Sequence, residues 1–138
     1  MKTSFLLISD QDEPAWAEAL KEALDRFGHL NIVREGQAEA EILRARHDLI
    51  IIDAAAINQP ARLVSRLLAL KPELRIAVAA AAPEWQETRN VLRAGAVDYF
   101  RRSPNKEELH FTIRDILVSL SLIAPWSQLI DADIGELS

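Results

Sequence analysis

Two carboxylates that follow apolar runs are the residues of this sequence best suited to chemistry. Asp10 comes directly after residues 4–9, and Asp53 comes directly after residues 49–52. A continuous apolar run is typical of a strand that helices cover on both faces. In an open parallel sheet, ligands bind just beyond the carboxyl ends of the strands. We therefore expect Asp10 and Asp53 to share one cleft.

A cleft with crowded carboxylates needs a cation, because like charges at short distance repel one another. Asp12 and Glu13 add two more acids shortly after Asp10. Mg²⁺ is a hard cation that prefers oxygen ligands, so the sequence predicts a Mg²⁺ site at Asp10 and Asp53. The alternative is that each acid only caps a helix or a turn.

Several other catalytic and binding patterns are absent from the sequence. The glycines do not form a phosphate-binding loop after the first apolar run, and there is no cysteine to act as a nucleophile or metal ligand. The serines lack the context of a nucleophile elbow. Three histidines lack the spacing of metal ligands, which favours surface or capping roles for them: His29, His47 and His110.

The composition indicates one folded domain. Of the 138 residues, 49% are hydrophobic and 27% are charged, a balance typical of a globular domain of this size. The net charge of -5 argues against direct nucleic-acid binding, which needs a clustered basic surface. No apolar run has the length of a membrane span or the form of a secretory signal, so we expect a cytoplasmic protein.

Short apolar runs alternate with helical patterns along the chain. The predicted strands are residues 4–9, 30–34, 49–53, 76–82 and 97–101. The predicted helices run from Pro14 to a stop at Gly28, from 37 to 46 after a break at Gly36, and over 60–70, 83–94 and 104–120. Parallel strands need crossover connections, which are usually helices. The pattern therefore predicts an α/β domain, a doubly wound parallel sheet with helices on both faces.

Several of these segments resemble the receiver domain of two-component response regulators. They are residues 6–14, 48–53, 93–99 and 103–109, and the resemblance covers residues 3–122. The string Ala-Gly-Ala-Val-Asp-Tyr at 94–99 is the most specific of them. The resemblance implies a flavodoxin-like sheet in the order 2-1-3-4-5. It also implies a regulatory signal-transduction module, not an enzyme, that works in a phosphorelay with a sensor histidine kinase or another signalling protein.

The resemblance also assigns roles to individual residues. Asp53 becomes the phosphoryl acceptor, and Tyr99 becomes the aromatic residue that switches conformation. The implied Mg²⁺ ligands are Asp10, Asp53 and the carbonyl of Ala55, with Gln11 or Asp12 as a further candidate.

Three positions depart from the family pattern. Gln11 stands where a second acid is usual, Ala80 where a Ser or Thr is usual, and Arg102 where a Lys is usual. A neutral Gln11 weakens Mg²⁺ binding, and a planar guanidinium does not replace a compact ammonium group. We therefore expect weak Mg²⁺ binding, slow or absent phosphorylation of Asp53, and a module that acts through protein–protein interaction.

The residues leave three alternatives open. One is a competent, Mg²⁺-dependent phosphoacceptor that uses Asp53. Another is a flavodoxin-like domain that binds a small ligand at the same edge of the sheet. In the third, Arg102 forms an ion pair with Asp53 or Asp10 and locks one conformation without a metal.

The resemblance further implies a partner surface made by the fourth helix, the fifth strand and the fifth helix. The residues that it points to are Trp85, Arg89, Arg93, Arg101, His110 and Arg114. A homodimer through this surface is one expectation, and an ordinary solvated surface is the alternative. Residues 123–138 follow the receiver-like residues 1–122 as an extension or linker. Their apolar side chains pack back on the domain, form a dimer contact, or begin a connection to an output domain.

Overall fold

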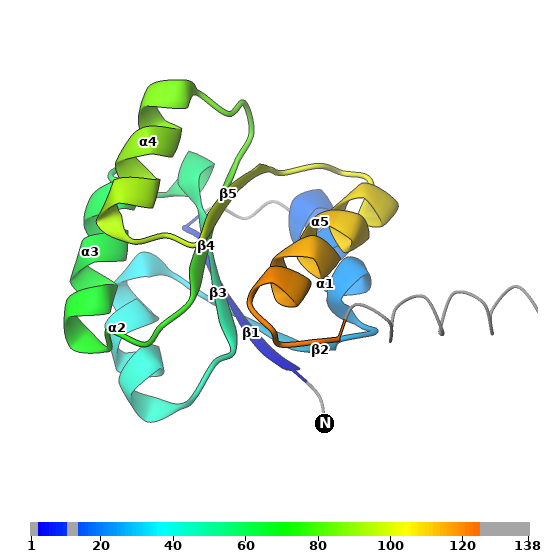
Figure 1. The fold of residues 1–138 in the computed structure, drawn as a ribbon, viewed down its shortest axis with the longest axis horizontal. Coiled ribbons are helices and arrows are strands. Elements are labelled where there is room, and N and C mark those ends of the chain that lie inside the picture. The colour runs from blue at the N-terminus through cyan, green and yellow to red at the C-terminus, as the bar shows by residue number, and fades with distance from the viewer. Residues whose placement is uncertain (1–2, 11–13, 125–138) are drawn as a thin grey trace, which may run out of the picture.

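The computed structural model describes residues 3–10 and 14–124, and within them five strands alternate with five α-helices (Figure 1). In chain order the elements are β1 (Thr3–Ile8), α1 (Pro14–Leu24), β2 (Gly28–Val33), α2 (Glu35–Arg44), β3 (Leu49–Asp53), α3 (Pro60–Leu70), β4 (Ile76–Ala80), α4 (Trp85–Ala94), β5 (Asp98–Arg101) and α5 (Lys106–Ser119). A short 3-10 helix, η1 (Ala54–Ala56), follows β3 directly.

The strands form one parallel sheet in the order β2-β1-β3-β4-β5, which confirms the predicted topology. At the carboxyl end of β1, Ile8 is paired with Ile52 of β3. One residue further along, Asp53 is paired with Ala79 of β4. The carboxyl ends of these three strands therefore lie side by side, at the edge where such sheets bind ligands.

Helices cover both faces of the sheet (Figure 1). α1 and α5 pack on one face, together with Phe5 and Leu7 of β1. α2, α3 and α4 pack on the other face, together with Leu6 and Ile8. Burial of one such side chain contributes about 1.5–3 kcal/mol. Because both faces of β3 are covered, every residue of this strand is buried, which explains the continuous apolar run at 49–52.

Gly28 has a different role from the predicted helix stop. α1 ends at Leu24, Phe27 lies in the turn that follows, and Gly28 begins β2 opposite Thr3. A Cβ at position 28 would overlap the carbonyl group of Thr3. Gly28 is therefore required for the close approach of β2 to β1, and the helix ends before it.

The other boundaries differ from the prediction by a few residues. Gly36 does not break the chain, because it lies in the first turn of α2, which begins at Glu35. α4 begins at Trp85, where the side chain of Glu84 caps it by accepting the Gln86 amide hydrogen. The stop at Gly95 is confirmed, since this residue has a φ of 115° in the left-handed region.

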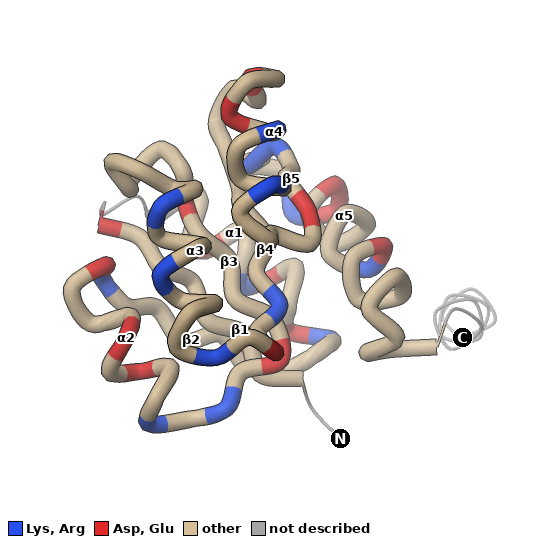
Figure 2. The backbone as a smooth tube through the Cα atoms, turned by 60° about the vertical axis from the view of Figure 1, so that its left-hand side comes forward, with Lys and Arg blue, Asp and Glu red and all other residues tan. Residues whose placement is uncertain are grey.

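Charged residues are distributed over the helices rather than gathered on one of them. Figure 2 shows Lys and Arg interspersed with Asp and Glu along α2, α4 and α5. None of the helices in residues 3–10 and 14–124 has the length and apolar composition needed to cross a membrane.

Candidate functional site

Asp53 ends β3 at the carboxyl edge of the sheet, and its side chain is completely buried. The Ser9 hydroxyl donates a hydrogen bond to Asp53 Oδ2 at 3.1 Å. The amide of Ala55 donates to Asp53 Oδ1 at 3.2 Å, so Asp53 caps η1. The carboxylate is therefore held from two sides, by the strand end before it and by the turn after it.

Arg102 brings a positive charge to this buried acid. Its Nη1 lies 3.0 Å from both carboxylate oxygens of Asp53. The Arg102 amide donates to the carbonyl of Ala80 at 2.8 Å, which continues the pairing of β5 with β4 and places the side chain over the sheet edge. The side chain of Arg102 is 14% exposed. The structure thus contains the ion pair of Arg102 with Asp53 that the third alternative describes.

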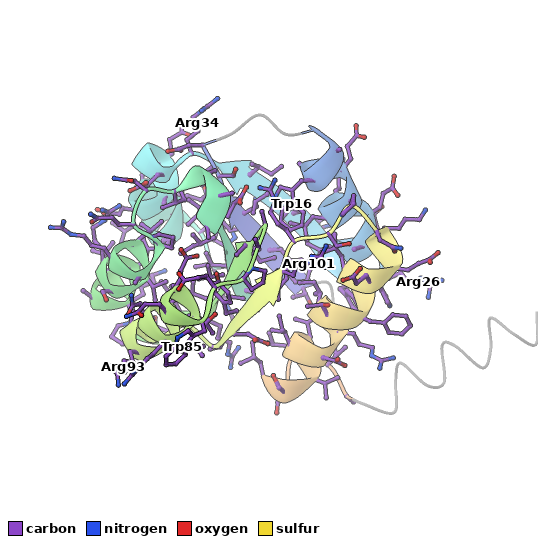
Figure 3. All side chains as sticks on the ribbon, turned by 90° about the horizontal axis from the view of Figure 1, so that it is seen from above. Trp16, Arg26, Arg34, Trp85, Arg93 and Arg101 are labelled. Atoms are coloured by element: carbon purple, nitrogen blue, oxygen red, sulfur yellow. The ribbon has the colours of Figure 1, made fainter. Side chains whose placement is uncertain are left out.

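Trp16, on α1, contacts the same guanidinium. The Cζ atom of Arg102 lies 5.5 Å from the centroid of the indole ring, within the range of a cation–π contact. Trp16 is 5% exposed and belongs to the core between the sheet and the helices α1 and α5. Figure 3 shows Trp16 near the middle of the domain, whereas Arg34 and Arg93 point outward.

Ser9, and not Asp10, faces Asp53. The Ser9 amide donates to Val33 of β2 at 3.0 Å, so the extended backbone of β1 continues through Ser9. Successive side chains of a strand alternate between its faces. The exposed Asp10 accordingly turns to α2, where its Oδ1 accepts the Glu35 amide hydrogen at 2.8 Å. Asp10 therefore caps the start of α2, as the alternative to a metal site predicted. The sequence analysis did not identify Ser9 as the residue that contacts Asp53.

The described residues at this edge do not fit a divalent cation. Both oxygens of Asp53 accept hydrogen bonds from Arg102, and the Asp10 carboxylate binds the start of α2. Within residues 3–10 and 14–124, no group of three or more His, Asp or Glu side chains is arranged to hold a metal ion. Gln11 and Asp12 lie outside the described residues. Arg102 supplies at Asp53 the positive charge that a metal ion would bring.

Comparison with known proteins identifies the fold. No protein-family model and no curated protein matches the chain. A response regulator from Thermotoga maritima is 24% identical, with a TM-score of 0.69 over 83% of this chain and 98% of that chain. A response regulator receiver domain protein from Methanospirillum hungatei JF-1 is 19% identical, with a TM-score of 0.72 over 86% of this chain and 96% of that chain. The chain has the receiver-domain fold.

A third structure with the receiver fold was determined with a phosphorylated aspartic acid, a calcium ion and citrate. It is a response regulator protein from Burkholderia pseudomallei, 21% identical, with a TM-score of 0.65 over 98% of this chain and 75% of that chain. Identities at this level establish the fold, so the chemistry has to be argued from the residues of this chain.

Ala80 and Tyr99, to which the resemblance assigned a switch role, lie on the opposite face of the sheet from Asp53. Ala80 ends β4 as a buried methyl group with no hydroxyl to offer. Tyr99 on β5 packs against the core formed with α2, α3 and α4. Its hydroxyl donates to Glu87 Oε1 on α4 at 2.9 Å. Burial, and then this contact with Glu87, raises the pKa of Tyr99 to about 12.

The predicted partner residues line two different grooves of the domain. Trp85, Arg89 and Arg93 line one shallow groove on α4. His110 and Arg114 instead line the groove between α5 and α1. The His110 ring stacks on Phe27, in the turn after α1, with 4.9 Å between the ring centroids, and its Nδ1 lies 3.3 Å from the carbonyl oxygen of Ala23 on α1. Arg101 is exposed on β5. Three of the predicted residues thus share one groove on α4, and the role of this surface stays a prediction.

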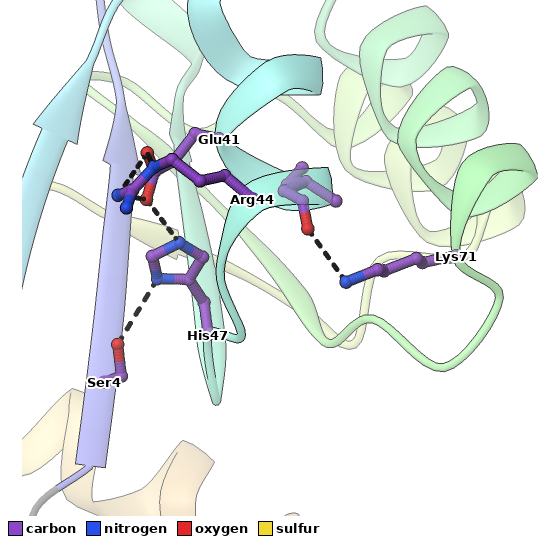
Figure 4. A network of polar contacts seen from close by, with 6 residues as sticks. Ser4, Glu41, Arg44, His47 and Lys71 are labelled. Carbon is purple, nitrogen blue, oxygen red and sulfur yellow. Dashed lines mark hydrogen bonds and ion pairs between the residues drawn. The ribbon is translucent and has the colours of Figure 1, made fainter.

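A second polar network lies at the amino end of the sheet (Figure 4). His47, predicted as a surface or capping residue, is buried there, with its side chain 2% exposed. Its Nε2 lies 3.0 Å from Glu41 Oε2, and its Nδ1 lies 3.3 Å from Ser4 Oγ. Hydrogen bonds from Arg44, opposed by partial burial and supported by His47, hold the pKa of Glu41 below its usual value. The sequence missed this network, because its members come from β1, α2 and the loop before β3.

The predicted extension is described only at its beginning. Leu122 and Ile123 are partly buried and pack against the core between the sheet and the helices α1 and α5. Residues 125–138 lie outside the described residues, and their role stays a prediction.

Proposed function

We propose that this chain is a signal-transduction receiver module that works through protein–protein interaction, with a fixed Asp53–Arg102 ion pair in place of phosphorylation and metal binding. The observation that supports this most directly is the position of Arg102 Nη1, 3.0 Å from both oxygens of a completely buried Asp53. The receiver fold supports the signalling role.

Phosphoryl transfer to a carboxylate requires an oxygen that is free to attack phosphorus. It also requires cations that hold the oxygens of the transferred group. In this chain Oδ1 accepts hydrogen bonds from Ala55 and Arg102, and Oδ2 accepts them from Ser9 and Arg102. A phosphodonor would have to displace Arg102 from a buried charge, which is costly because an unpaired buried carboxylate is strongly destabilising. We therefore expect Asp53 to be phosphorylated slowly or not at all.

For the partner surface we propose the α4 groove. Trp85 is 69% exposed, and Arg89 lies over its ring with 5.6 Å from Cζ to the centroid. Tryptophan and arginine are the residue types that carry most energy in protein interfaces. A sensor histidine kinase or another signalling protein is the partner class that fits the receiver fold.

The proposal is tested by incubation with a small acyl phosphate and Mg²⁺, followed by intact-protein mass spectrometry. We expect the native chain to gain no single phosphate, as the Asp53→Asn control does. An adduct on the native chain that disappears in Asp53→Asn would contradict the proposal and support the competent phosphoacceptor. The variant Arg102→Lys shows whether a compact cation at this position is enough to permit transfer.

A further inference from the structure

We propose that Trp16 is the positioning residue that holds Arg102 on Asp53, and that Trp16 and Arg102 together close this site to divalent cations. The inference rests on the ion pair of the proposed function and adds the residue that fixes it. Trp16 reaches the pair from α1, whereas Asp53 is the last residue of β3 and Arg102 directly follows β5.

The guanidinium of Arg102 contacts both Asp53 and Trp16. Its Nη1 binds the Asp53 carboxylate at 3.0 Å, and its Cζ lies 5.5 Å from the centroid of the Trp16 indole. A planar guanidinium suits this arrangement, because it donates hydrogen bonds along its edge while its face stays available to an aromatic ring. A lysine ammonium has no such face, so the contact with Trp16 favours arginine over lysine at position 102.

The indole nitrogen of Trp16 distinguishes this role from simple packing. Trp16 Nε1 is buried and has no hydrogen-bond partner among residues 3–10 and 14–124. A buried donor without a partner costs desolvation free energy. Phenylalanine or leucine would fill apolar space without that cost, so packing alone does not favour tryptophan here. Attraction of a cation does favour it, since the indole is the best aromatic partner for a guanidinium.

Trp85 offers a comparison within the same chain. Arg89 lies over its ring at 5.6 Å, nearly the distance of the Arg102 contact, but Trp85 is 69% exposed. A cation–π contact is weaker in water than in a desolvated site. The buried pair at Trp16 should therefore restrain its arginine much more than the exposed pair at Trp85. Trp85 supplies the matched control.

A divalent cation at Asp53 would have to displace Arg102 from the carboxylate and from the indole of Trp16. The carboxylate would exchange one positive charge for another, and Arg102 would lose the indole contact without replacement. We expect the native site to stay closed to Mg²⁺ for this reason, and to open when the indole is removed.

The test compares Trp16→Leu, Trp16→Phe and Trp85→Leu with the native chain. Proton exchange at the Arg102 guanidinium is followed by nuclear magnetic resonance, with Arg102→Lys used to assign the signal. Exchange should be about tenfold faster in Trp16→Leu, intermediate in Trp16→Phe and unchanged in Trp85→Leu. The unfolding temperature should rise with millimolar Mg²⁺ only in the Trp16 variants.

An exchange rate in both Trp16 variants equal to that in Trp85→Leu would overturn the inference and leave Trp16 as a packing residue. If Trp16→Leu does not fold, Trp16→Phe decides the matter, because its ring fills the space but attracts a cation less strongly. A native chain that is itself stabilised by Mg²⁺ would contradict both the closed site and the proposed function. Equal exchange in every variant, with no response of the native chain to Mg²⁺, would contradict the inference alone.

Discussion

β1 has a polar network at each end, and the two networks differ in how deeply their arginine–carboxylate pair is buried. At the carboxyl end, Ser9 and Arg102 bind the buried carboxylate of Asp53. At the amino end, Ser4 contacts His47, which lies against Glu41. The side chains of Arg102 and Asp53 are 14% and 0% exposed, whereas those of Arg44 and Glu41 are 68% and 11% exposed. The carboxyl end therefore holds a buried ion pair, and the amino end holds a buried histidine beside a partly exposed ion pair.

The comparison teaches that burial by itself does not distinguish a functional site from a structural one. His47 and Asp53 are both buried polar residues with more than one partner. Only Asp53 lies at the carboxyl edge, where parallel sheets bind their ligands. The amino-end network joins α2 and the loop before β3 to β1, which is a structural task. Separate changes at the two ends should therefore have different consequences.

The largest effect is expected for Arg102→Ala. This change leaves the Asp53 carboxylate buried without its cation, so we expect a loss of about 3–5 kcal/mol in the free energy of unfolding. Urea denaturation measures it. The double variant Asp53→Asn with Arg102→Met should recover most of the loss, because no buried charge is left. As a control, Lys106→Ala breaks the exposed pair with Glu22 and should cost less than about 1 kcal/mol. Equal costs for Arg102→Ala and Lys106→Ala would show that the ion pair does not hold the site.

A smaller effect is expected at the amino end for His47→Phe. The ring of phenylalanine keeps much of the volume but leaves the Ser4 hydroxyl without the histidine nitrogen. We expect a loss of about 1–3 kcal/mol in the free energy of unfolding, typical of broken buried hydrogen bonds. Reactivity of Asp53 towards an acyl phosphate should not change. An increase in that reactivity would mean that the two ends of β1 are coupled, against the separation argued above.

The smallest effect is expected at Tyr99, whose neutral hydroxyl donates a hydrogen bond to the carboxylate of Glu87. Tyr99 is the single tyrosine of the chain, so tyrosinate absorbance reports on it alone. Its pKa is raised from 10.0 to about 12. The associated stability is present below pH 10.0 and is lost as the pH rises through about 12. Glu87→Gln should move the absorbance midpoint part of the way towards 10.0, because burial remains. An unchanged midpoint would show that Glu87 does not contribute.

Features with a local signal were predictable from the sequence. The apolar run ending at Asp53 predicted β3 and its place at the carboxyl edge, and α3 begins and ends at the predicted Pro60 and Leu70. Proline at a helix start and glycine after a helix end are signals that depend on the backbone of one segment. The order of the strands followed from the same alternation and the family resemblance.

Features that depend on register were not predictable in this way. Ser9 is the last residue of the predicted strand 4–9, and it faces Asp53 because Ile8 is paired with Ile52. Asp10 was expected beside Asp53, but the alternation of side chains along β1 sends it to α2. Contacts between His47 and Ser4 join residues 43 positions apart in the chain. Periodicity within one segment carries no information about such distant neighbours.

The covalent attachment of Arg102 has a consequence for how the charge at Asp53 is supplied. A metal ion reaches its site from solution, so its occupancy depends on concentration and is abolished by a chelator. Arg102 belongs to the same chain as its partner, and its effective concentration at Asp53 does not change on dilution. The positive charge is thus provided when the protein is synthesised and folded. The proposed function therefore implies the same form of this site in a cell poor in Mg²⁺ and in a cell rich in it.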